Sequence, residues 1–588
     1  LYNERFNSHV NRDFDGSLLD FPGMNTEISL RPHQKNAVAR TLFGGNTLLA
    51  HAVGAGKTFE MQASAMEAKR IGLCSKSLMI MPKHLVEDFG AEFLRLYPNA
   101  NVLLPTPDDF KKERRQELFA KIISQDWDAI VMSYQQFEKL PLSKKHQEAF
   151  IQEEIESLQH TEAAYKNATR GDDNFNSKRI GAYIRSLKFK LEHISKSKDE
   201  GISFEELGID RLYVDESHYF KNMFVKTQMS NVSGISVNDT QKGLDFYNKV
   251  KYLNQLTHER GLVFASGTPI SNSVSEMYIL QKYLAPSRLQ EAKLYNFDDW
   301  ATTFGEKVTD VEISPTGTSF RTKTRFSKFN NIQELQSMFH EFADVKTADM
   351  LNLAVPECKI EVVKAEASDV QLDILQSLEE RSDAINRRSP QSVQKKSGEL
   401  VEDNFLLITN HGRLLAMDPR LLDSKYEDFA GSKINMCVDK VVDIYNKSMD
   451  DKLTQVIFSD IGTPNPEKRK NGEFCLYDDV RQKLEEQGVP HDEIAYVHDA
   501  KTPEAREELF KKVRSGKIRI IFGSSDKLGV GTNIQDKLVA MHELDVPWTP
   551  AKIEQRMGRI VRQGNTNKEV KIFRYVTEST FDAYMWQT

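Results

Sequence analysis

The run from Leu48 to Thr58 constrains the fold of this 588-residue chain more than any other stretch. It reads "LLAHAVGAGKT": a strand-like apolar segment, a glycine-rich turn, and then a lysine and a threonine that open a helical pattern. In this order, the backbone amides of the turn and the N-terminus of the helix surround phosphate oxygens. The sequence therefore predicts a nucleotide phosphate site in an α/β protein, made by Gly54, Ala55, Gly56, Lys57 and Thr58.

One position of this loop departs from the usual pattern G-x-x-x-x-G-K-[ST]. The first glycine is replaced by His51, which lies where the chain leaves the strand. The residues that contact phosphate are all present: Lys57 is expected to neutralise the β- and γ-phosphates, and Thr58 to bind a magnesium ion. Two interpretations of His51 stay open: it packs beneath the loop, or it tunes the affinity for nucleotide.

Short apolar runs alternate with helical patterns in two parts of the chain. The runs are continuous rather than alternating, which is typical of parallel sheets that helices cover on both faces. Predicted strands lie at 47–53, 77–82, 129–134, 211–217 and 261–267, and again at 454–460, 494–499, 518–525, 538–545 and 570–576. The predicted fold class is therefore α/β, with two parallel-sheet blocks and helical insertions.

The chain divides into four expected parts. Residues 1–29 form a polar lead-in, 30–284 the first α/β block, 285–430 a mostly helical linking region and 431–588 the second block. Within the first block, residues 140–205 are charged and poor in glycine, which predicts a helical insertion. Its second half (178–198) and a run at 321–328 are rich in lysine and arginine. Each run is either a solvated face or a surface that contacts phosphates.

Composition limits the class of protein. No apolar run approaches the roughly 18–20 residues that cross a bilayer, and the N-terminus lacks the pattern of a signal peptide. The four cysteines form no C-x-x-C pair, which argues against zinc and against a disulfide framework and fits a reducing cytoplasm. With a net charge of −7, a nucleic-acid partner would need local basic patches. Since no initiator Met is present, we expect both ends to be cuts through a longer protein.

Two further segments carry the residue types that a phosphate loop requires. In "LYVDESH", an acidic pair follows a predicted strand, so that Asp215 would hold magnesium and Glu216 would polarise the attacking water. In "QRMGRIVRQG", residues 555–564, Arg556, Arg559 and Arg562 recur every three positions, roughly on one helical face. Arginines of that kind stabilise charge as the γ-phosphate leaves. Because they belong to the other α/β block, hydrolysis would require the two blocks to close.

These segments, in this order, resemble the motifs of superfamily 2 helicases and translocases. "LRPHQ" resembles the glutamine motif, "HAVGAGKT" motif I, "DESH" motif II, "SGTPISNS" motif III, "VIFSD" motif IV, "GSSDKLGVGTN" motif V and "QRMGRIVR" motif VI. The resemblance implies two RecA-like lobes that bind ATP and Mg²⁺. It implies adenine recognition by Gln34, nucleotide contacts from Gly529 and Gly531, and catalytic roles for Gln555, Arg559 and Arg562. "LMIMPKHLVEDFGAEF" and "VMSYQQFEKL" resemble motifs Ia and Ib, which touch the nucleic-acid backbone.

Within that superfamily the chain is similar to the Swi/Snf-type translocases of double-stranded DNA. "GTPISNSVSEMYILQKYL" and "ITNHGRLLAMDPRLLD" carry this likeness. More narrowly, "FPGMNTEISLRPHQKNAVAR" resembles the helicase segment of large bacterial proteins on conjugative elements and phages, which often include an adenine-specific DNA methyltransferase. No N-P-P-[YFW] or D-P-P-[YFW] motif occurs in this chain. The resemblance implies a cytoplasmic, bacterial or phage- or plasmid-encoded motor that contacts the backbone of duplex DNA, with further domains in the same larger polypeptide.

Three other functions remain to be weighed. A strand-separating DNA or RNA helicase uses the same motifs, and no separation wedge is readable. A DNA-binding scaffold with a vestigial ATPase is disfavoured because Lys57, Asp215, Glu216 and the motif VI arginines are intact. A phosphate-loop ATPase of another kind, such as a transporter motor, is disfavoured by the glutamine motif upstream and by motif VI in a second block.

Overall fold

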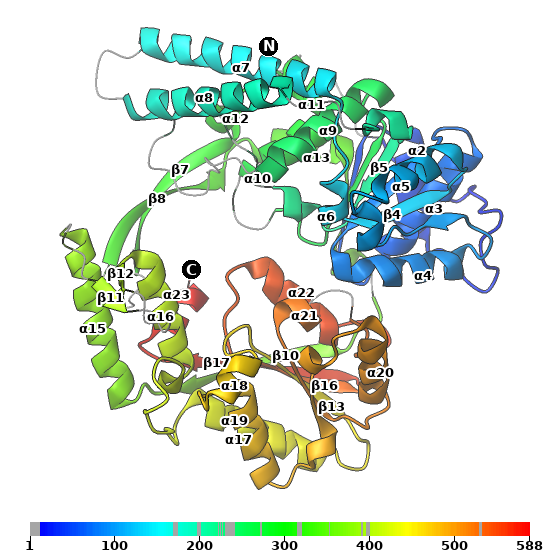
Figure 1. The fold of residues 1–588 in the computed structure, drawn as a ribbon. Helices are drawn as coiled ribbons and strands as arrows, with labels where there is room; N and C mark the ends of the chain where they lie inside the picture. Colours follow the sequence, from blue (N-terminus) through cyan, green and yellow to red (C-terminus); the bar gives the residue numbers. More distant parts are fainter. Residues whose placement is uncertain are drawn as a thin grey trace. The chain divides into compact units, whose positions relative to one another are not determined.

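The computed structural model divides the chain into two compact units, which are described in turn. One comprises residues 1–309 and 324–352, and the other residues 310–323 and 353–588 (Figure 1). The structure describes residues 12–168, 174–196, 201–221, 223, 225, 227, 229, 241–270, 273, 275–313, 320–351, 353–387, 389, 392–394, 400–528 and 532–587.

The first unit is built on a seven-stranded sheet in which every neighbouring pair is parallel, in the order β3-β4-β2-β5-β6-β1-β9. The strands are β1 (Thr47–His51), β2 (Ser77–Met81), β3 (Val102–Leu103), β4 (Ala129–Ser133), β5 (Arg211–Val214), β6 (Leu262–Ala265) and β9 (Ala343–Lys346). All residues of β1, β2, β4, β5 and β6 are buried. The prediction of a parallel sheet from continuous apolar runs is confirmed.

Helices cover both faces of this sheet. Against one face pack α2 (Pro32–Phe43), α3 (Lys57–Arg70) and α4 (Val86–Leu96), with a core that combines alanines such as Ala37 and Ala63 with larger side chains such as Phe93. The other face is rich in aromatic rings, among them Phe246 and Trp300. It is covered by α5 (Arg115–Ser124), α9 (Gln241–Thr257), α10 (Ser275–Leu284), α12 (Phe297–Phe304) and α13 (Ile332–Phe342). Shorter helices are α6 (Tyr134–Phe137), α11 (Pro286–Glu291) and α14 (Ala348–Leu351).

The charged interval within this unit contains two long helices, α7 (Lys144–Ala168) and α8 (Asn174–Lys196), which lie side by side (Figure 1). A small apolar core of its own joins them, formed by Ile151, Ile155, Leu158, Ile180, Ile184 and Leu187. Burial of this apolar stripe gives each helix a face to pack with, which explains why the interval reads as charged and yet folds as helix.

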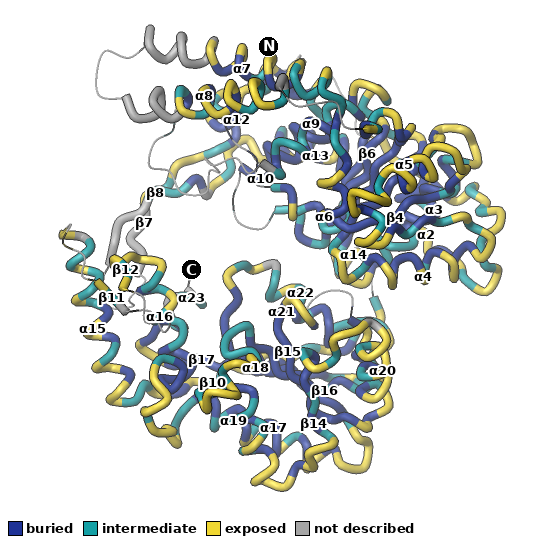
Figure 2. The backbone as a smooth tube through the Cα atoms, viewed as in Figure 1, coloured by how far each residue is buried: buried dark blue, intermediate teal, exposed yellow. Residues whose placement is uncertain are grey.

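The second unit has a six-stranded sheet, again parallel throughout, in the order β10-β17-β16-β13-β15-β14. Its strands are β10 (Glu357–Ala365), β13 (Thr454–Phe458), β14 (Ile494–Tyr496), β15 (Ile520–Gly523), β16 (Leu538–Glu543) and β17 (Glu569–Thr577). Helices α17 (Lys433–Lys447) and α19 (Leu476–Glu486) share one core with the sheet, and α20 (Pro503–Arg514), α21 (Ser525–Leu528) and α22 (Pro550–Ile560) share another. Figure 2 shows the central strands of the two sheets in the colour of buried residues.

The interval 285–430, expected to be mostly helical, contains strands as well. Its helices include α15 (Asp369–Asn386) and α16 (Phe405–Met417). Its strands are β7 (Gly305–Ile313) paired with β8 (Phe320–Phe329), β11 (Ser392–Gln394) paired with β12 (Leu400–Glu402), and β9 and β10. β9 completes the first sheet and β10 the second, so the division between the units falls inside this interval. Both are edge strands with few buried residues, and a search for continuous apolar runs overlooks such strands.

The remaining helices of the second unit are α18 (Pro466–Lys470) and α23 (Phe581–Gln587). Across the described part of the chain, no helix is long and apolar enough to cross a membrane.

Candidate active site

The phosphate loop, residues 52–58, connects β1 to α3 and depends on two glycines. Gly54 and Gly56 have φ angles of 86° and 94°, in the left-handed region that other residues rarely adopt. A Cβ atom on Gly56 would also lie only 2.2 Å from Nε2 of Gln34. The loop therefore turns tightly enough to place Lys57 and Thr58 in the first turn of α3, as the sequence predicts.

Gln34, from α2, lies directly against this loop. Its side chain is 5% exposed, and Nε2 donates to the carbonyl oxygens of Ala55 (3.3 Å) and Gly56 (3.4 Å). Its Oε1 accepts from the backbone amide of Arg31 at 2.8 Å. The neighbouring His33 Nε2 lies 3.0 Å from the same Ala55 oxygen. In this structure Gln34 supports the loop backbone, and its contact with adenine stays a prediction.

Lys57 lies where its ammonium group would contact the phosphate oxygens of a bound nucleotide. Its Nζ donates to the carbonyl oxygens of His51 (2.8 Å) and Ala52 (3.3 Å), at the end of β1. A Cβ atom on Gly267, in motif III, would lie 3.7 Å from the same Nζ. The ammonium group therefore lies between the phosphate loop and motif III.

The acidic pair Asp215–Glu216 follows the end of β5, as the sequence predicts. The Asp215 amide donates to the carbonyl of Ile80 on β2 (3.0 Å), and the Glu216 amide donates to Asp215 Oδ1 (3.0 Å). Glu216 has a left-handed φ of 48°. Burial, and then the adjacent Glu216 carboxylate, raise the pKa of Asp215 to about 7, against a smaller opposing effect of Lys57. The Asp215 carboxyl is thus a buried group whose charge a cation would stabilise.

Three residues that the sequence did not single out complete this constellation. Tyr134, the first residue of α6, donates its hydroxyl to the carbonyl oxygen of Asp215 and lies 3.4 Å from that of Glu216. His218 Nδ1 lies 3.2 Å from Glu216 Oε2 and 3.4 Å from the hydroxyl of Ser266, in motif III. Each of the three lies just beyond the carboxyl end of a strand, where ligands of parallel sheets bind. That position is the signal that identifies them.

His51 is completely buried beneath the phosphate loop. Its Nδ1 lies 2.9 Å from the Glu60 carboxylate on α3, and its Nε2 lies 3.2 Å from Oδ2 of Asp344 on β9. The expectation that His51 packs under the loop describes its position, and in addition each of its ring nitrogens faces a carboxylate.

The motif VI residues lie in the second unit, on and just after α22. Arg559 and Arg562 both donate from NH1 to the carbonyl oxygen of Thr532, at 3.0 and 2.9 Å. Gln555 is half-buried, and its backbone oxygen accepts from Arg559 Nε at 3.3 Å. Gly529 and Gly531 lie outside the described residues, so their predicted nucleotide contacts cannot be placed on this loop.

Arg556 does not share a surface with the other two arginines, and the prediction of one common face is wrong for this residue. Its side chain is 0% exposed and forms ion pairs with Asp545 (2.9 Å) and Asp460 (3.4 Å), with a further bond to Ser525 Oγ at 2.8 Å. Helix α22 ends at Ile560, so Arg562 lies beyond it and the three arginines cannot share one helical face. The carboxylates of Asp460 and Asp545 hold the side chain of Arg556 toward the core of the unit.

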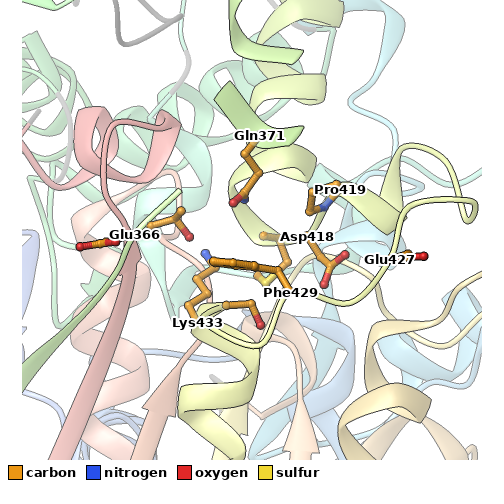
Figure 3. A pocket seen from close by; sticks show the side chains of 10 residues that line it. Glu366, Gln371, Asp418, Pro419, Glu427, Phe429 and Lys433 are labelled. Atoms are coloured by element: carbon orange, nitrogen blue, oxygen red, sulfur yellow. The ribbon is translucent and has the colours of Figure 1, made fainter. Parts of the chain in front are cut away.

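A small hollow in the second unit is separate from all these residues. Glu366, Gln371 and Lys433 contribute to its lining (Figure 3). Its volume of about 10 Å³ is the space that one water molecule fills. Lys433 is itself ion-paired to Asp582 at 2.5 Å. The hollow is a packing feature and adds nothing to the candidate site.

Comparison with known proteins follows the same division of the chain. A family model described as a probable helicase domain matches residues 41–347, more than half of the chain, and one described as a helicase conserved C-terminal domain matches residues 467–564. These spans include the phosphate loop and the acidic pair in the first unit, and Gln555, Arg559 and Arg562 in the second.

Individual relatives are distant. The Defense against restriction protein B of Escherichia phage P1 is 21% identical, with all of this chain covering 33% of that protein. The ISWI chromatin-remodeling complex ATPase ISW2 of Saccharomyces cerevisiae is 22% identical, with 96% of this chain covering 39% of it. A solved Sulfolobus solfataricus SWI2/SNF2 ATPase core in complex with dsDNA is 15% identical, covers 95% of this chain and 90% of its own, and has a TM-score of 0.34. This chain spans between a third and two fifths of the curated relatives it matches. It belongs to the helicase-domain family whose model matches residues 41–347.

Proposed function

We propose that this chain is a motor that hydrolyses ATP to move along double-stranded DNA. The observation that carries the proposal is the assembly at one sheet edge of the phosphate loop, the Asp215–Glu216 pair and Ser266 of motif III, all intact. A vestigial ATPase would have lost one of these groups.

The chemistry of the first unit suits an ATP–magnesium complex. Lys57 would exchange its two carbonyl partners for β- and γ-phosphate oxygens, which are stronger acceptors because they are charged. Thr58 and Asp215 are the proposed protein ligands of the metal ion, which would neutralise phosphate charge. The donor set fits, because a divalent cation favours the ionised form of the buried Asp215 carboxyl. Glu216, oriented by His218, would accept a hydrogen bond from the attacking water.

The second unit would supply positive charge to the same reaction. We assign this role to Arg559 and Arg562, with Gln555 beside them. In the described structure both guanidinium groups donate a hydrogen bond to the carbonyl oxygen of Thr532, which is a neutral acceptor. A γ-phosphate is a charged acceptor and would compete well for them. Turnover would then require the units to close, and alternating closure and opening would drive movement.

Duplex DNA is the proposed track. Backbone contacts would dominate, so binding would be tolerant of sequence and sensitive to salt. On α8, Arg185 and Lys188 are exposed and are candidates for additional phosphate contacts. In the 321–328 run Lys328 is also exposed, whereas the side chains of Lys178 and Lys323 lie outside the described part. The strand-separating helicase remains the second candidate, on the same motifs.

The motor is proposed to be one part of a larger polypeptide of a phage, plasmid or bacterium. The share of its relatives that this chain spans, and the phage origin of one of them, support this. A DNA-modifying activity elsewhere in that polypeptide is part of the same proposal.

Displacement of a triplex-forming third strand from duplex DNA tests translocation directly. We expect ATP-dependent displacement by the protein and none by Glu216→Gln, which keeps the fold and the ATP site. Separation of the two duplex strands in place of third-strand displacement would favour the helicase alternative.

A further inference from the structure

The residue that departs from the phosphate-loop pattern, His51, lies at the centre of a buried charged group. His51 and Glu60 have side chains that are 0% exposed, and the Asp344 side chain is 14% exposed. The three come from three elements: the strand before the loop (β1), the helix after it (α3) and the edge strand β9. We name these three residues the His51 triad.

The geometry fixes the protonation of the imidazole. A neutral imidazole has one N–H donor, so its second nitrogen would face a carboxylate with a lone pair. Here a carboxylate oxygen lies within 3.2 Å of each ring nitrogen. With both carboxyl groups ionised, the imidazolium is the form that places a proton toward each of them. The contact with Asp344 is an ion pair rather than an aligned hydrogen bond, since Nε2 has no partner of hydrogen-bond geometry.

The surrounding charges agree with that form. Burial lowers the pKa of His51, but the two close carboxylates of Asp344 and Glu60 outweigh it and raise the pKa above its ordinary value. On β9, Lys346 lies 3.4 Å from Asp344. On α2, the positive charge of Arg40 helps to lower the pKa of the Asp344 carboxyl, and His33 Nε2 lies 3.8 Å from Glu60. The cations around Asp344 offset the second carboxylate, which leaves the group close to neutral.

The triad connects the phosphate loop to the segment by which the chain leaves the first unit. The carbonyl oxygen of His51 is the one that accepts from Lys57 Nζ at 2.8 Å. The next amide, that of Ala52, donates to the carbonyl of Lys346 on β9 at 2.8 Å. After β9 the chain forms α14 and then enters the second unit at residue 353. The side chain of His51 therefore contacts the helix that follows the loop, and its carbonyl oxygen contacts the lysine of the loop.

We propose that His51 is a positioning residue for nucleotide binding: held as an imidazolium between Glu60 and Asp344, it fixes both ends of the phosphate loop and ties them to β9. This deepens the proposed ATP site and rests on it. When the imidazolium loses its proton, one carboxylate contact becomes repulsive and the loop loses its pre-organised shape, which weakens the binding of phosphate groups. Because the folded-state pKa is raised, the stabilising contact is complete below the ordinary pKa of His and is lost as the pH rises through the folded value.

The test combines a spectroscopic titration with a binding titration. NMR of ring-labelled histidine, with His51→Gln used to assign the signal, gives the charge state of His51 without nucleotide. Fluorescence of N-methylanthraniloyl-ADP with magnesium gives the affinity across the same pH range. We expect His51 to titrate above about 6.5, and the affinity to fall about tenfold as it does so.

Two asparagine variants separate positioning from general stability. Asp344→Asn removes one carboxylate and should move both titrations to lower pH together. Asp349→Asn makes the same chemical change at an exposed site on α14 and should move neither. A His51 signal that titrates at or below the ordinary value, or an affinity profile that Asp344→Asn leaves unchanged, would overturn the proposal. If the wild-type protein binds no nucleotide at any pH, the ATP site itself is refuted, and the NMR titration still decides the charge of His51.

Discussion

Replacement of Arg556 by Met distinguishes a structural from a catalytic arginine within one motif. Met keeps most of the side-chain volume and removes the charge, which leaves Asp545, whose side chain is 2% exposed, without its cation. Burial alone lowers the pKa of Arg556, but Asp545, Asp460 and Glu543 raise it, so the buried guanidinium stays charged. Breaking a buried ion pair on one side costs about 3–5 kcal/mol. For a unit of this size, that corresponds to a fall in melting temperature of roughly 6–20 °C.

Hydrogen exchange read by mass spectrometry is the suitable assay, because it reports peptides of the second unit separately from those of the first. We expect Arg556→Met to speed exchange in β13, β16 and α22 and to lower the calorimetric transition of that unit. Arg562→Met is the matched control from the same motif, since Arg562 is half-buried and donates to the neutral carbonyl oxygen of Thr532; it should lose ATP turnover with a smaller loss of stability than Arg556→Met. Wild-type exchange and stability in Arg556→Met, together with lost turnover, would refute the structural role and restore Arg556 to the catalytic group.

Three further substitutions test the first unit. Glu216→Gln should bind ATP normally and abolish hydrolysis, because the amide cannot act as the base; near-normal turnover would remove that assignment. Tyr134→Phe deletes the hydroxyl that holds the Asp215 and Glu216 carbonyl oxygens, so kcat should fall while KM for ATP stays constant, and steady-state kinetics that show an unchanged kcat would contradict this. Gly56→Ala places a Cβ at a φ of 94° and against Gln34. The backbone strain alone is about 1–2 kcal/mol, so calorimetric ATP affinity should fall at least about tenfold; wild-type affinity would mean that the loop adapts.

Much of the fold was predictable because its signal is local. Continuous apolar runs become strands of both sheets, and their predicted positions agree with β1, β2, β4 to β6 and β13 to β17. β9 and β10 were not predictable in this way. β9 has four residues of which one is buried, and β10 alternates charged and apolar side chains as an exposed edge does.

The candidate site shows the same limit. Lys57, Asp215 and Glu216 follow strand ends and could be assigned to one sheet edge from the sequence. The state of His51 and of Arg556 could not, because it depends on carboxylates that are distant in the chain. Asp344 reaches His51 only after β9 joins β1, and Asp460 and Asp545 reach Arg556 only after β13 and β16 are paired. Spacing along one helix cannot reveal which face such partners will occupy.

The rate of ATP hydrolysis, measured in parallel with duplex DNA, single-stranded DNA and RNA of equal length, tests the central claim most directly. We expect the strongest stimulation by duplex DNA, independent of its sequence and weaker at higher salt because backbone contacts dominate. The strongest stimulation by RNA, or an ATPase rate that no nucleic acid changes, would contradict it.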